Sequence, residues 1–538
     1  MYKIKNSVPI DVIELYDITD EDSKKFKEID EKPADFETAI TACGFGKFNI
    51  ILYIISTAAG WSSVFETTTM SYVFPAAECD LELKLSHKGL LNAVTYSGMI
   101  SSAVIWGFLC DTLGRRKLLL IGFLLDALFF LMAASSQSFT LLMIAKFLGG
   151  FIINGPFAAL TSYLSEFHNA HHRARVQMVL GTIFSFGNLA LPLLALGVLP
   201  IDINVKMGEY FVFHSWNLYL LICSLPALIS GIAFIFLPES PKFLMTMGRN
   251  EKALQVFRKV YRMNTGKPES TFPVKELVDE TKVTKENSNK RGGHVTANRT
   301  KVQAMREGWQ QIKPLFFPPH VAKFILVFTI QCLIMMSLNT LRLWLPQIFQ
   351  AINDYQYYNN ETASLCVMME VFQPKNMSIN ATECVVNYNN SRVYANSMIV
   401  AFTSMVGYIT AGTLINTLGK KKLLCILGTV SGTMAMSLYF SRNTPTTVVL
   451  SALFIAFGSI GINVILAVVV DLFPTTLRTM TVSLTMMFGR AGAVLGNLVF
   501  PFLLEAGCAP PFFAVGSVML GCAFLTCLLP NTDMKALQ

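Results

Sequence analysis

The chain has 538 residues, of which 53% are hydrophobic and only 14% are charged, and its mean hydropathy is +0.48. Soluble domains carry about 25% charged residues, so this composition excludes an ordinary soluble protein. The formal net charge of +8 fits a membrane protein whose basic loops lie against the anionic inner leaflet, and it does not require nucleic acid as a partner.

Apolar stretches long enough to cross a bilayer recur along the whole chain. About 20 helical residues cross a hydrocarbon core, and only helices or closed barrels satisfy their backbone groups there. Six stretches precede a central polar segment and six follow it. The sequence therefore predicts an all-α membrane protein with twelve transmembrane helices. The predicted spans are 48–77, 89–110, 118–136, 139–164, 176–199, 215–237, 324–350, 395–418, 423–440, 446–470, 479–504 and 511–530.

The predicted domain organisation follows from these spans. We expect the N-terminal tail to be a disordered or loosely helical lead, with a regulatory or trafficking role as the alternative. Residues 251–261 have the apolar spacing of a helix lying under the membrane domain, and residues 264–300 have the composition of a flexible linker. The predicted parts are the N-terminal tail (1–45), the N-terminal six-helix bundle (46–237), the central loop (238–320), the C-terminal six-helix bundle (321–530) with its outer loop (351–393), and the C-terminal tail (531–538).

Positive charge is distributed unequally between the two sets of loops. By the positive-inside rule, this asymmetry predicts that both termini and the central loop are cytoplasmic. The loops 111–117, 165–175, 238–323, 419–422 and 471–478 hold 26 Lys and Arg residues, against six in the opposite loops. Four of the five N-glycosylation signals agree, because they fall in the outer loop, at Asn360, Asn376, Asn380 and Asn389.

The eleven cysteines fall into two groups. Most lie inside apolar helices, where a small core residue is the expected role. Cys366 and Cys384 share the outer loop, and a disulfide between them is our first expectation. Cys79 and Cys508 also lie in outer loops and are the rival partners.

One motif occurs twice, at an offset of 305 residues. Residues 107–119 read GFLCDTLGRRKLL and residues 412–424 read GTLINTLGKKKLL. Each copy places a glycine turn between two apolar runs, which indicates a tandem duplication. An acid and an arginine seven residues apart recur at the same offset, after the fourth and tenth predicted helices.

We interpret the polar residues of these repeats as a gate at the cytoplasmic face. Charge-assisted hydrogen bonds there would hold the two halves together in one state and separate in the other. Anchoring by positive loops would account for the basic residues alone, but not for the repeated glycine and acid spacing. The gating candidates are Asp111, Gly114, Arg115, Arg116, Glu166, Arg173, Glu239, Asn416, Gly419, Lys420, Asp471 and Arg478.

Five ionisable side chains inside the predicted spans are candidates for substrate binding or ion coupling. A charge at the centre of a bilayer costs about 2.5–3.5 kcal/mol on insertion scales, so such residues face the protein interior or a cavity. These residues are Glu66, Asp126, Lys146, Arg342 and Arg490. Arg490 cannot be neutralised by losing its proton, so we expect an anionic partner for it. The alternatives are that Glu66 marks a helix end and that Lys146 reaches outward to the membrane surface.

The repeated motif and the acid–arginine spacing together resemble the major facilitator superfamily. Within it, the chain is similar to synaptic vesicle glycoprotein 2 and related organic ion transporters. The segments that carry this resemblance are 73–78 (VFPAAE), 162–167 (SYLSEF), 213–216 (FHSW) and 238–243 (PESPKF). The synaptic proteins share an Asp-Gly-Val-Glu motif in helix 1, and residues 63–66 here read Ser-Val-Phe-Glu.

The resemblance implies two pseudo-symmetric six-helix bundles around a central cavity, with substrate near the midplane and alternating access to each side. It also implies that helix 3 lies outside the cavity, which argues against Asp126 as a substrate ligand. Two positive residues, Arg342 and Arg490, and one negative residue, Glu66, would give the cavity a net positive charge. Such a cavity favours an organic anion or a zwitterion. The alternative is that Glu66 pairs with the arginines.

We therefore expect a secondary transporter that works as a monomer, with a small organic solute and a proton or other coupling ion as partners. Its location would be the plasma membrane or an intracellular vesicle membrane. The alternative is a membrane binding or trafficking protein with little transport activity. The sequence indicates no enzyme, cofactor or metal site, and it has no phosphate-binding loop for ATP.

Neutralising the gate should slow transport more than it weakens solute binding. We expect Asp111→Asn or Arg478→Gln to lower the turnover rate about tenfold, which corresponds to roughly 1.4 kcal/mol on the barrier. The reason is that both side chains act on the change of state and not on the solute. Turnover and affinity measured in proteoliposomes check this, and unchanged turnover in both variants would contradict the gating role.

Overall fold

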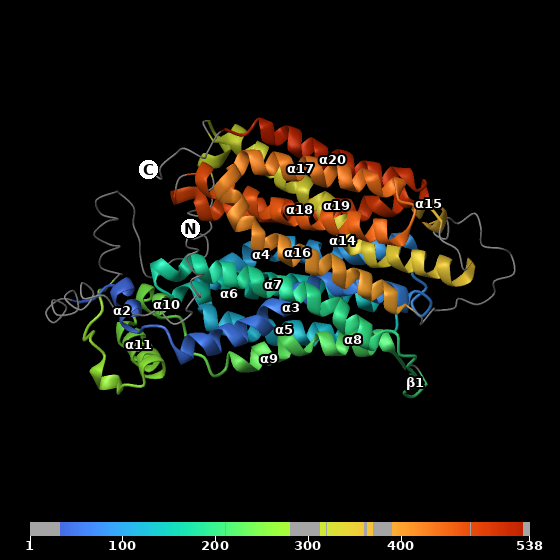
Figure 1. The fold of residues 1–538 in the computed structure, drawn as a ribbon. Helices are drawn as coiled ribbons and strands as arrows, with labels where there is room; N and C mark the ends of the chain where they lie inside the picture. Colours follow the sequence, from blue (N-terminus) through green and yellow to red (C-terminus); the bar gives the residue numbers. More distant parts are fainter. Residues whose placement is uncertain are drawn as a thin grey trace, which may run out of the picture. The chain divides into compact units, whose positions relative to one another are not determined.

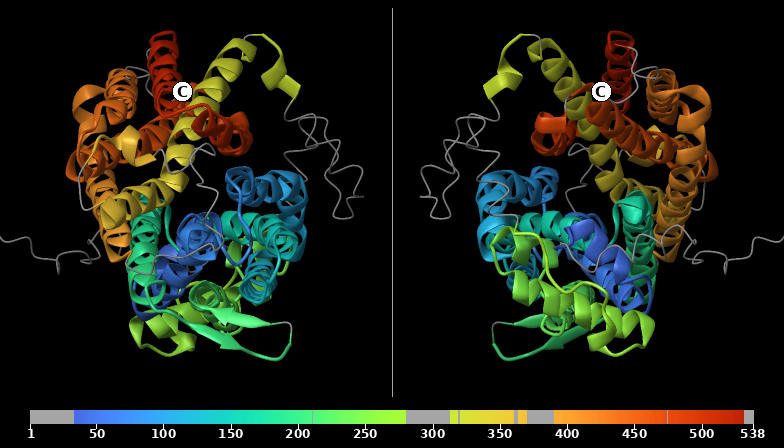
Figure 2. Two further views of the ribbon diagram at one scale, coloured as in Figure 1. Left: turned by 90° about the vertical axis from the view of Figure 1, so that its right-hand side faces the viewer. Right: turned by 90° about the vertical axis from the view of Figure 1, so that its left-hand side faces the viewer.

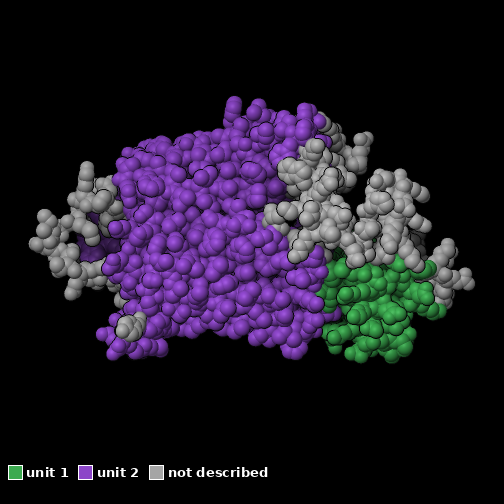
Figure 3. All heavy atoms as spheres, turned by 180° about the vertical axis from the view of Figure 1, so that it is seen from behind, with its two compact units in different colours: residues 1–52, 165–173, 239–295 green, residues 53–164, 174–238, 296–538 purple. Residues whose placement is uncertain are grey.

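The computed structural model describes residues 33–209, 211–279, 313–318, 320–359, 363–369, 390–473 and 475–530. The chain divides into two compact units, which Figure 3 draws in two colours. Unit 1 combines Met1–Leu52, Ser165–Arg173 and Glu239–Val295, and unit 2 combines Tyr53–Leu164, Ala174–Pro238 and Thr296–Gln538. Unit 1 therefore gathers parts of the predicted tail, one inter-helix loop and the central loop, whereas unit 2 holds the membrane helices.

The first half of the membrane domain consists of long helices, coloured blue to green in Figure 1. They are α3 (Lys47–Ala77), α4 (Leu85–Leu113), α5 (Arg115–Ala134), α6 (Phe139–Glu166), α7 (Ala170–Val198), α8 (Ser215–Cys223) and α9 (Leu225–Ala233). The last two form one span with an interruption at Ser224, two residues before Pro226, which lacks a backbone N–H. A short antiparallel hairpin between α7 and α8, β1 (Asn204–Lys206) and β2 (Val212–His214), marks one end of the domain.

The second half repeats this arrangement, coloured yellow to red. Figures 1 and 2 show its helices gathered on the other side of unit 2. The helices are α14 (Val321–Asn359), α16 (Ser391–Leu418), α17 (Lys420–Ser437), α18 (Thr444–Leu472), α19 (Thr475–Glu505) and α20 (Ala509–Cys527), with the short η3 (Lys313–Phe316), α15 (Leu365–Met368) and η6 (Leu438–Phe440) between them.

Helices cover all the predicted membrane spans. In the part of the chain that the structure describes, 11 helices are long and apolar enough to cross a bilayer. The remaining predicted span, 89–110, lies within α4, a helix of 29 residues. The predicted all-α membrane fold is therefore confirmed.

The two copies of the repeated motif adopt the same turn. Gly114 separates α4 from α5 with φ 89° and ψ 157°, and Gly419 separates α16 from α17 with φ 76° and ψ 153°. This backbone region is open almost only to glycine, because a Cβ would collide with the neighbouring backbone. The sequence repeat is thus also a structural repeat at this position.

Glycines also allow helices to approach closely, both between the two halves and within the second half. A Cβ added at Gly89 of α4 would lie 2.6 Å from the backbone oxygen of Asn497 in α19. A Cβ at Gly492 of α19 would overlap the backbone oxygen of Cys332 in α14. Without a hydrophobic driving force inside lipid, such close packing of small residues is a main source of helix association.

Unit 1 has a small core of its own, built around one amphipathic helix. It contains α2 (Phe36–Ala42), α10 (Pro241–Thr246), α11 (Asn250–Thr265) and η2 (Glu269–Thr271). The predicted helix at 251–261 is α11, which buries Phe257, Val260 and Tyr261. Phe36 of α2 packs against Phe257, with ring centroids 6.0 Å apart.

Two expectations for unit 1 need correction. The end of the predicted tail is not a solvated lead, because residues 36–42 form α2 and bury Phe36 and Ile40. The start of the predicted flexible linker is ordered, because Val274 and Leu277 are buried and Leu277 forms a parallel bridge with Ala34. Scattered apolar residues in polar segments supply these contacts, and they are too few to stand out in the sequence.

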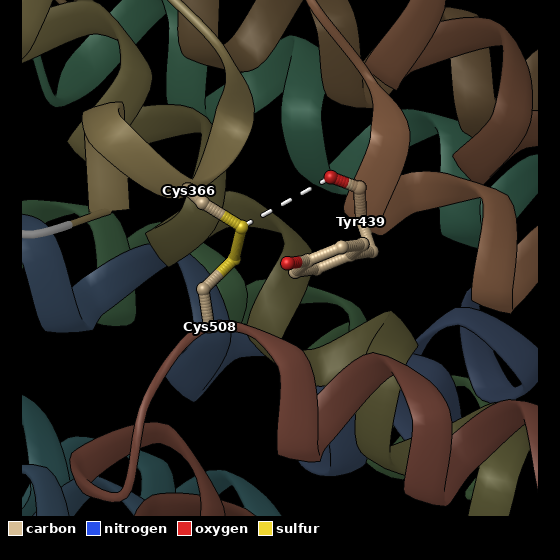
Figure 4. Close-up of a disulfide and its surroundings, with 3 residues drawn as sticks. All are labelled: Cys366, Tyr439 and Cys508. Carbon is tan, nitrogen blue, oxygen red and sulfur yellow. Dashed lines mark hydrogen bonds between the residues drawn. A yellow bond between two sulfur atoms is a disulfide. The ribbon is translucent and has the colours of Figure 1, made fainter.

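The disulfide expectation is corrected as well. Cys366 is bonded to Cys508, with Cα atoms 5.4 Å apart, and not to Cys384 (Figure 4). The physical reason is that α15 docks on the membrane domain, where the Leu365 N–H donates to the Ser441 oxygen at 2.9 Å. This contact places Cys366 beside the start of α20. Cys384 and the glycosylation sites Asn360, Asn376, Asn380 and Asn389 lie outside the described residues.

The backbone of Tyr439 lies near this disulfide. The backbone oxygen of Tyr439 lies 4.0 Å from the Cys366 sulfur (Figure 4). The other rival cysteine, Cys79, is disulfide-bonded too. Bonds of this kind form in an oxidising compartment, which fits the outer position predicted for these loops.

Removing the Cys366–Cys508 bond should destabilise the protein. A bond that joins residues 142 apart is typically worth about 2–4 kcal/mol. We expect Cys508→Ala to lower the midpoint of thermal unfolding in detergent. The control is Cys527→Ala, which removes a free and exposed cysteine and should leave the midpoint unchanged. Identical melting of the two variants would show that the bond contributes nothing.

Candidate substrate cavity and charged residues

A cavity in unit 2 lies between helices of the two halves. Its empty volume is about 630 Å³ when the open solvent at its mouth is included, and it is lined by α3 and α7 from the first half and by α14, α16 and α18 from the second. Hydroxyl and amide groups occupy much of its wall, which suits a polar ligand. The polar lining includes Thr68, Tyr72, Asn188, Arg342, Ser404 and Tyr408.

Arg342 is the only charged residue among those described that line this cavity. Its Nη2 donates to Asn339 Oδ1 at 2.9 Å and approaches the Tyr96 hydroxyl at 3.5 Å. Its Nε is buried and has no hydrogen-bond partner among the described residues. A guanidinium held by neutral groups, with a donor unused, is suited to a negatively charged ligand.

Arg490 lies in α19 and does not line the cavity. Its Nη1 donates to Asn154 Oδ1 at 2.6 Å, which links α19 to α6 across the two halves. We expected an anionic partner for Arg490, and the recorded partner is a neutral amide. This hydrogen bond lies next to Gly155 and Pro156 in the sequence of α6. The proline has no backbone N–H, so one backbone hydrogen bond of the helix is missing there.

Glu66 and Lys146 form an ion pair in the core of the first half. Lys146 Nζ lies 2.8 Å from Glu66 Oε1 and 2.9 Å from the Glu66 backbone oxygen. Both side chains are only 1% exposed. Gly149 makes room for the carboxylate, since an added Cβ there would overlap Glu66 Oε1.

This pair decides two alternatives from the sequence. Lys146 does not reach outward to the membrane surface, and the partner recorded for Glu66 is Lys146, not Arg342 or Arg490. Neither residue lines the cavity. Asp126 does not line the cavity either, and it accepts a hydrogen bond from Ser62 Oγ at 2.5 Å.

The gating candidates form pairs that their sequence spacing did not indicate. In unit 2, Lys420, the first residue of α17, forms an ion pair with Asp471, near the end of α18. By the 305-residue offset, the corresponding positions in the first half are Arg115 and Glu166. The seven-residue spacing of Asp471 and Arg478 therefore did not identify the recorded partner of Asp471.

Arg173 pairs outside the predicted gate. Within unit 1, its Nη2 contacts the carboxylate of Glu37. The other oxygen of Glu37 accepts from the Ala170 N–H at 3.0 Å, at the start of α7. Glu37 thus caps the N-terminus of α7, where a negative charge is stabilised.

The remaining gating candidates have local roles or are not described. Arg116 donates from Nε to the Phe234 oxygen at 3.1 Å and from Nη2 to the Ile235 oxygen at 2.5 Å, at the end of α9. Glu239 accepts from the Ser240 N–H at 3.0 Å. The side chains of Asp111, Asn416 and Arg478 are outside the part of the chain that the structure describes.

Sequence reasoning missed a contact at the hairpin end of the domain. Lys88 of α4 is fully buried and lies 2.8 Å from Glu78, which follows α3. Gln347 of α14 approaches the same carboxylate at 3.5 Å. By the charge count, Lys88 is one of the six basic residues of the outer loops, but its position just before the apolar stretch 89–110 was a signal for an internal partner.

Breaking the Glu66–Lys146 pair should be costly, whereas replacing both residues should not. We expect Glu66→Gln or Lys146→Met to lower the free energy of unfolding by roughly 3–5 kcal/mol, since each leaves a buried charge unpaired. The double variant should recover most of that loss. Thermal unfolding of the three variants measures the effect, and additive losses would contradict the pairing.

Comparison with known proteins agrees with this architecture. The profile of the Major Facilitator Superfamily matches residues 50–374 and 363–536. Synaptic vesicle glycoprotein 2B of Rattus norvegicus is 30% identical over 259 residues, which cover 47% of this chain and 38% of that protein. Synaptic vesicle glycoprotein 2A of Rattus norvegicus is 30% identical over 260 residues, which cover 48% and 35%. The match therefore spans less than half of these relatives' length.

Solved structures resemble the whole fold. The inward-open xylose transporter XylE from E. coli superposes with a TM-score of 0.62 at 15% identity, covering 91% of this chain and 98% of that one. A D-xylose-proton symporter superposes with a TM-score of 0.60 at 14% identity, covering 91% and 100%. At this identity the likeness concerns the fold alone. With most of its length matched by the family profile, this multi-pass membrane chain belongs to the Major Facilitator Superfamily, a family of transporters and not of enzymes.

Proposed function

We propose that this protein moves a small organic anion, or a zwitterion with an exposed acidic group, across a membrane by alternating access. The observation that carries this proposal is Arg342, the one charged residue among the described residues lining the cavity. An anionic group would supply the acceptor that the buried Arg342 Nε lacks.

The charge balance of the membrane domain supports an anion. Glu66 is neutralised by Lys146 and does not offset the cavity arginine. Arg490 is hydrogen-bonded to the neutral Asn154 and adds a second positive charge near the middle of the domain. A cationic solute would be repelled by these positive charges, because interactions between charges are strong where water is scarce.

The lining of the cavity limits the solute. Hydroxyl groups from Thr68, Tyr72, Ser404 and Tyr408 would hydrogen-bond to polar groups on the solute body. A monoanion with hydroxyl or amide substituents meets these conditions best.

Alternating access would use the contacts at the two ends of the domain. The Glu78–Lys88 pair and the close packing at Gly89 would open at the hairpin end, and the Lys420–Asp471 pair would rearrange at the other. A proton or another ion would drive the cycle. We place both termini in the cytoplasm and the protein, as a monomer, in the plasma membrane or a vesicle membrane.

The second candidate function is membrane binding or trafficking with little transport. It is favoured by the 30% identity to synaptic vesicle glycoproteins 2A and 2B. The polar cavity argues against this second function. It contains an arginine donor without a hydrogen-bond partner among the described residues, and a protein that binds no solute would not require such an arrangement.

Uptake in liposomes tests the proposal. The purified protein is reconstituted and offered labelled organic anions, zwitterions, cations and sugars. We expect uptake of anions or zwitterions, reduced at least about tenfold in Arg342→Gln, and partly kept in Arg342→Lys, which retains the charge but loses the planar donor fork.

The matched control is Arg262→Gln, which removes an arginine that is 57% exposed in unit 1 and should leave uptake unchanged. Anion uptake that survives Arg342→Gln would overturn the role of Arg342. Absence of any uptake by folded protein would instead favour the binding or trafficking function.

A further inference from the structure

A cluster of three ionisable groups lies in the core of the first half, separate from the cavity lining. It comprises Glu66 of α3, Asp126 of α5 and Lys146 of α6, with Ser62 of α3 one helical turn before Glu66. Asp126 is fully buried, and the other two are 1% exposed. Two carboxyl groups and a single ammonium group therefore lie together in one buried site.

The ammonium group is fully committed to Glu66. Lys146 Nζ makes one contact of 2.8 Å with the Glu66 carboxylate and one of 2.9 Å with its backbone oxygen. It also lies 4.7 Å from the centre of the Phe130 ring. These are the contacts of Lys146 with the described residues, and none of them is with Asp126.

Asp126 has only a neutral hydrogen-bond partner. Ser62 Oγ lies 2.5 Å from its Oδ2, and its buried Oδ1 has no hydrogen-bond partner among the described residues. An ionised carboxylate in such a site would be a buried charge without a counter-ion. That arrangement is among the most unfavourable in a protein interior, whereas a neutral carboxyl group is tolerated.

We propose that Asp126 carries a proton and that this cluster is a proton-binding site that holds one proton. With Lys146 positive, Glu66 negative and Asp126 neutral, the cluster has no net charge. Loss of the proton to water leaves one excess negative charge in the core. Among the described residues, Cys223 of α8 is a further titratable group that interacts electrostatically with Lys146 and Glu66, and it is fully buried.

The position of the cluster suggests how its proton would be exchanged. Asp126 has no access to solvent in this conformation, so the proton is trapped until α3 separates from α5. Helix α3 also carries Thr68 and Tyr72 of the cavity wall. Movement of α3 during a transport cycle would therefore open the proton site and reshape the cavity together. This coupling role depends on the proposed transport, but the presence of the proton does not.

Infrared spectroscopy of the purified full-length protein tests the proton directly. We expect the spectrum at pH 7 to contain a carbonyl band of a protonated carboxylic acid that is lost in Asp126→Asn and kept in Asp126→Glu. The matched control is Asp202→Asn, an exposed carboxylate before β1 whose removal should leave this band unchanged. A band that persists in Asp126→Asn would overturn the proposal.

Ser62→Ala keeps the test decisive if Asp126→Asn does not fold. This small substitution removes the hydrogen bond to the Asp126 carboxyl group, so it should shift the same band. An unshifted band would assign the proton to another carboxyl group and would contradict the proposal.

A liposome experiment tests the coupling role separately. We expect uptake of the transported solute to rise with an inward proton gradient in the wild type and in Asp202→Asn, and to lose that dependence in Asp126→Asn. Dependence retained in Asp126→Asn would overturn the coupling role. If no solute is transported at all, the proposed function fails, while the infrared result still decides whether the proton is present.

Discussion

Hydrocarbon offers no hydrogen bonds, so every charge in the membrane domain must be paired, hydrogen-bonded or open to a cavity. This constraint gives four charged residues of the membrane domain three different roles. Glu66 and Lys146 neutralise each other inside the first half. Arg490 is held by Asn154 across the two halves. Arg342 lines the cavity without an acidic partner there among the described residues. The proposed transport of anions depends on this positive charge.

The architecture was predictable from the sequence because lipid imposes it on every span. The length of the apolar stretches predicted the helices. Gly114 and Gly419 identified the repeated turn, because residues other than glycine rarely adopt their positive φ. These signals are local, and each is strong by itself. The resemblance to the Major Facilitator Superfamily rested on the same local motifs, and the family profile confirms it.

The pairings within the site were less predictable, because they depend on how helices rotate and pack. Spacing suggested that Cys366 bonds within its own loop, but the docking of α15 brings it to Cys508. The seven-residue spacing also suggested that Asp471 pairs with Arg478, whereas its partner in the structure is Lys420, the first residue of α17. The neutral lining of the cavity carried no sequence signal at all, because serine and tyrosine are common in helices of every kind.

The account depends most directly on the charge of the solute that the cavity accepts. The decisive measurement is the affinity of the purified protein for a matched series of one transported skeleton bearing a carboxylate, a neutral amide or an amine. The account predicts that the carboxylate binds at least about tenfold tighter than the amide, and that the amine binds weakest. Tightest binding of the amine would contradict a cavity governed by Arg342.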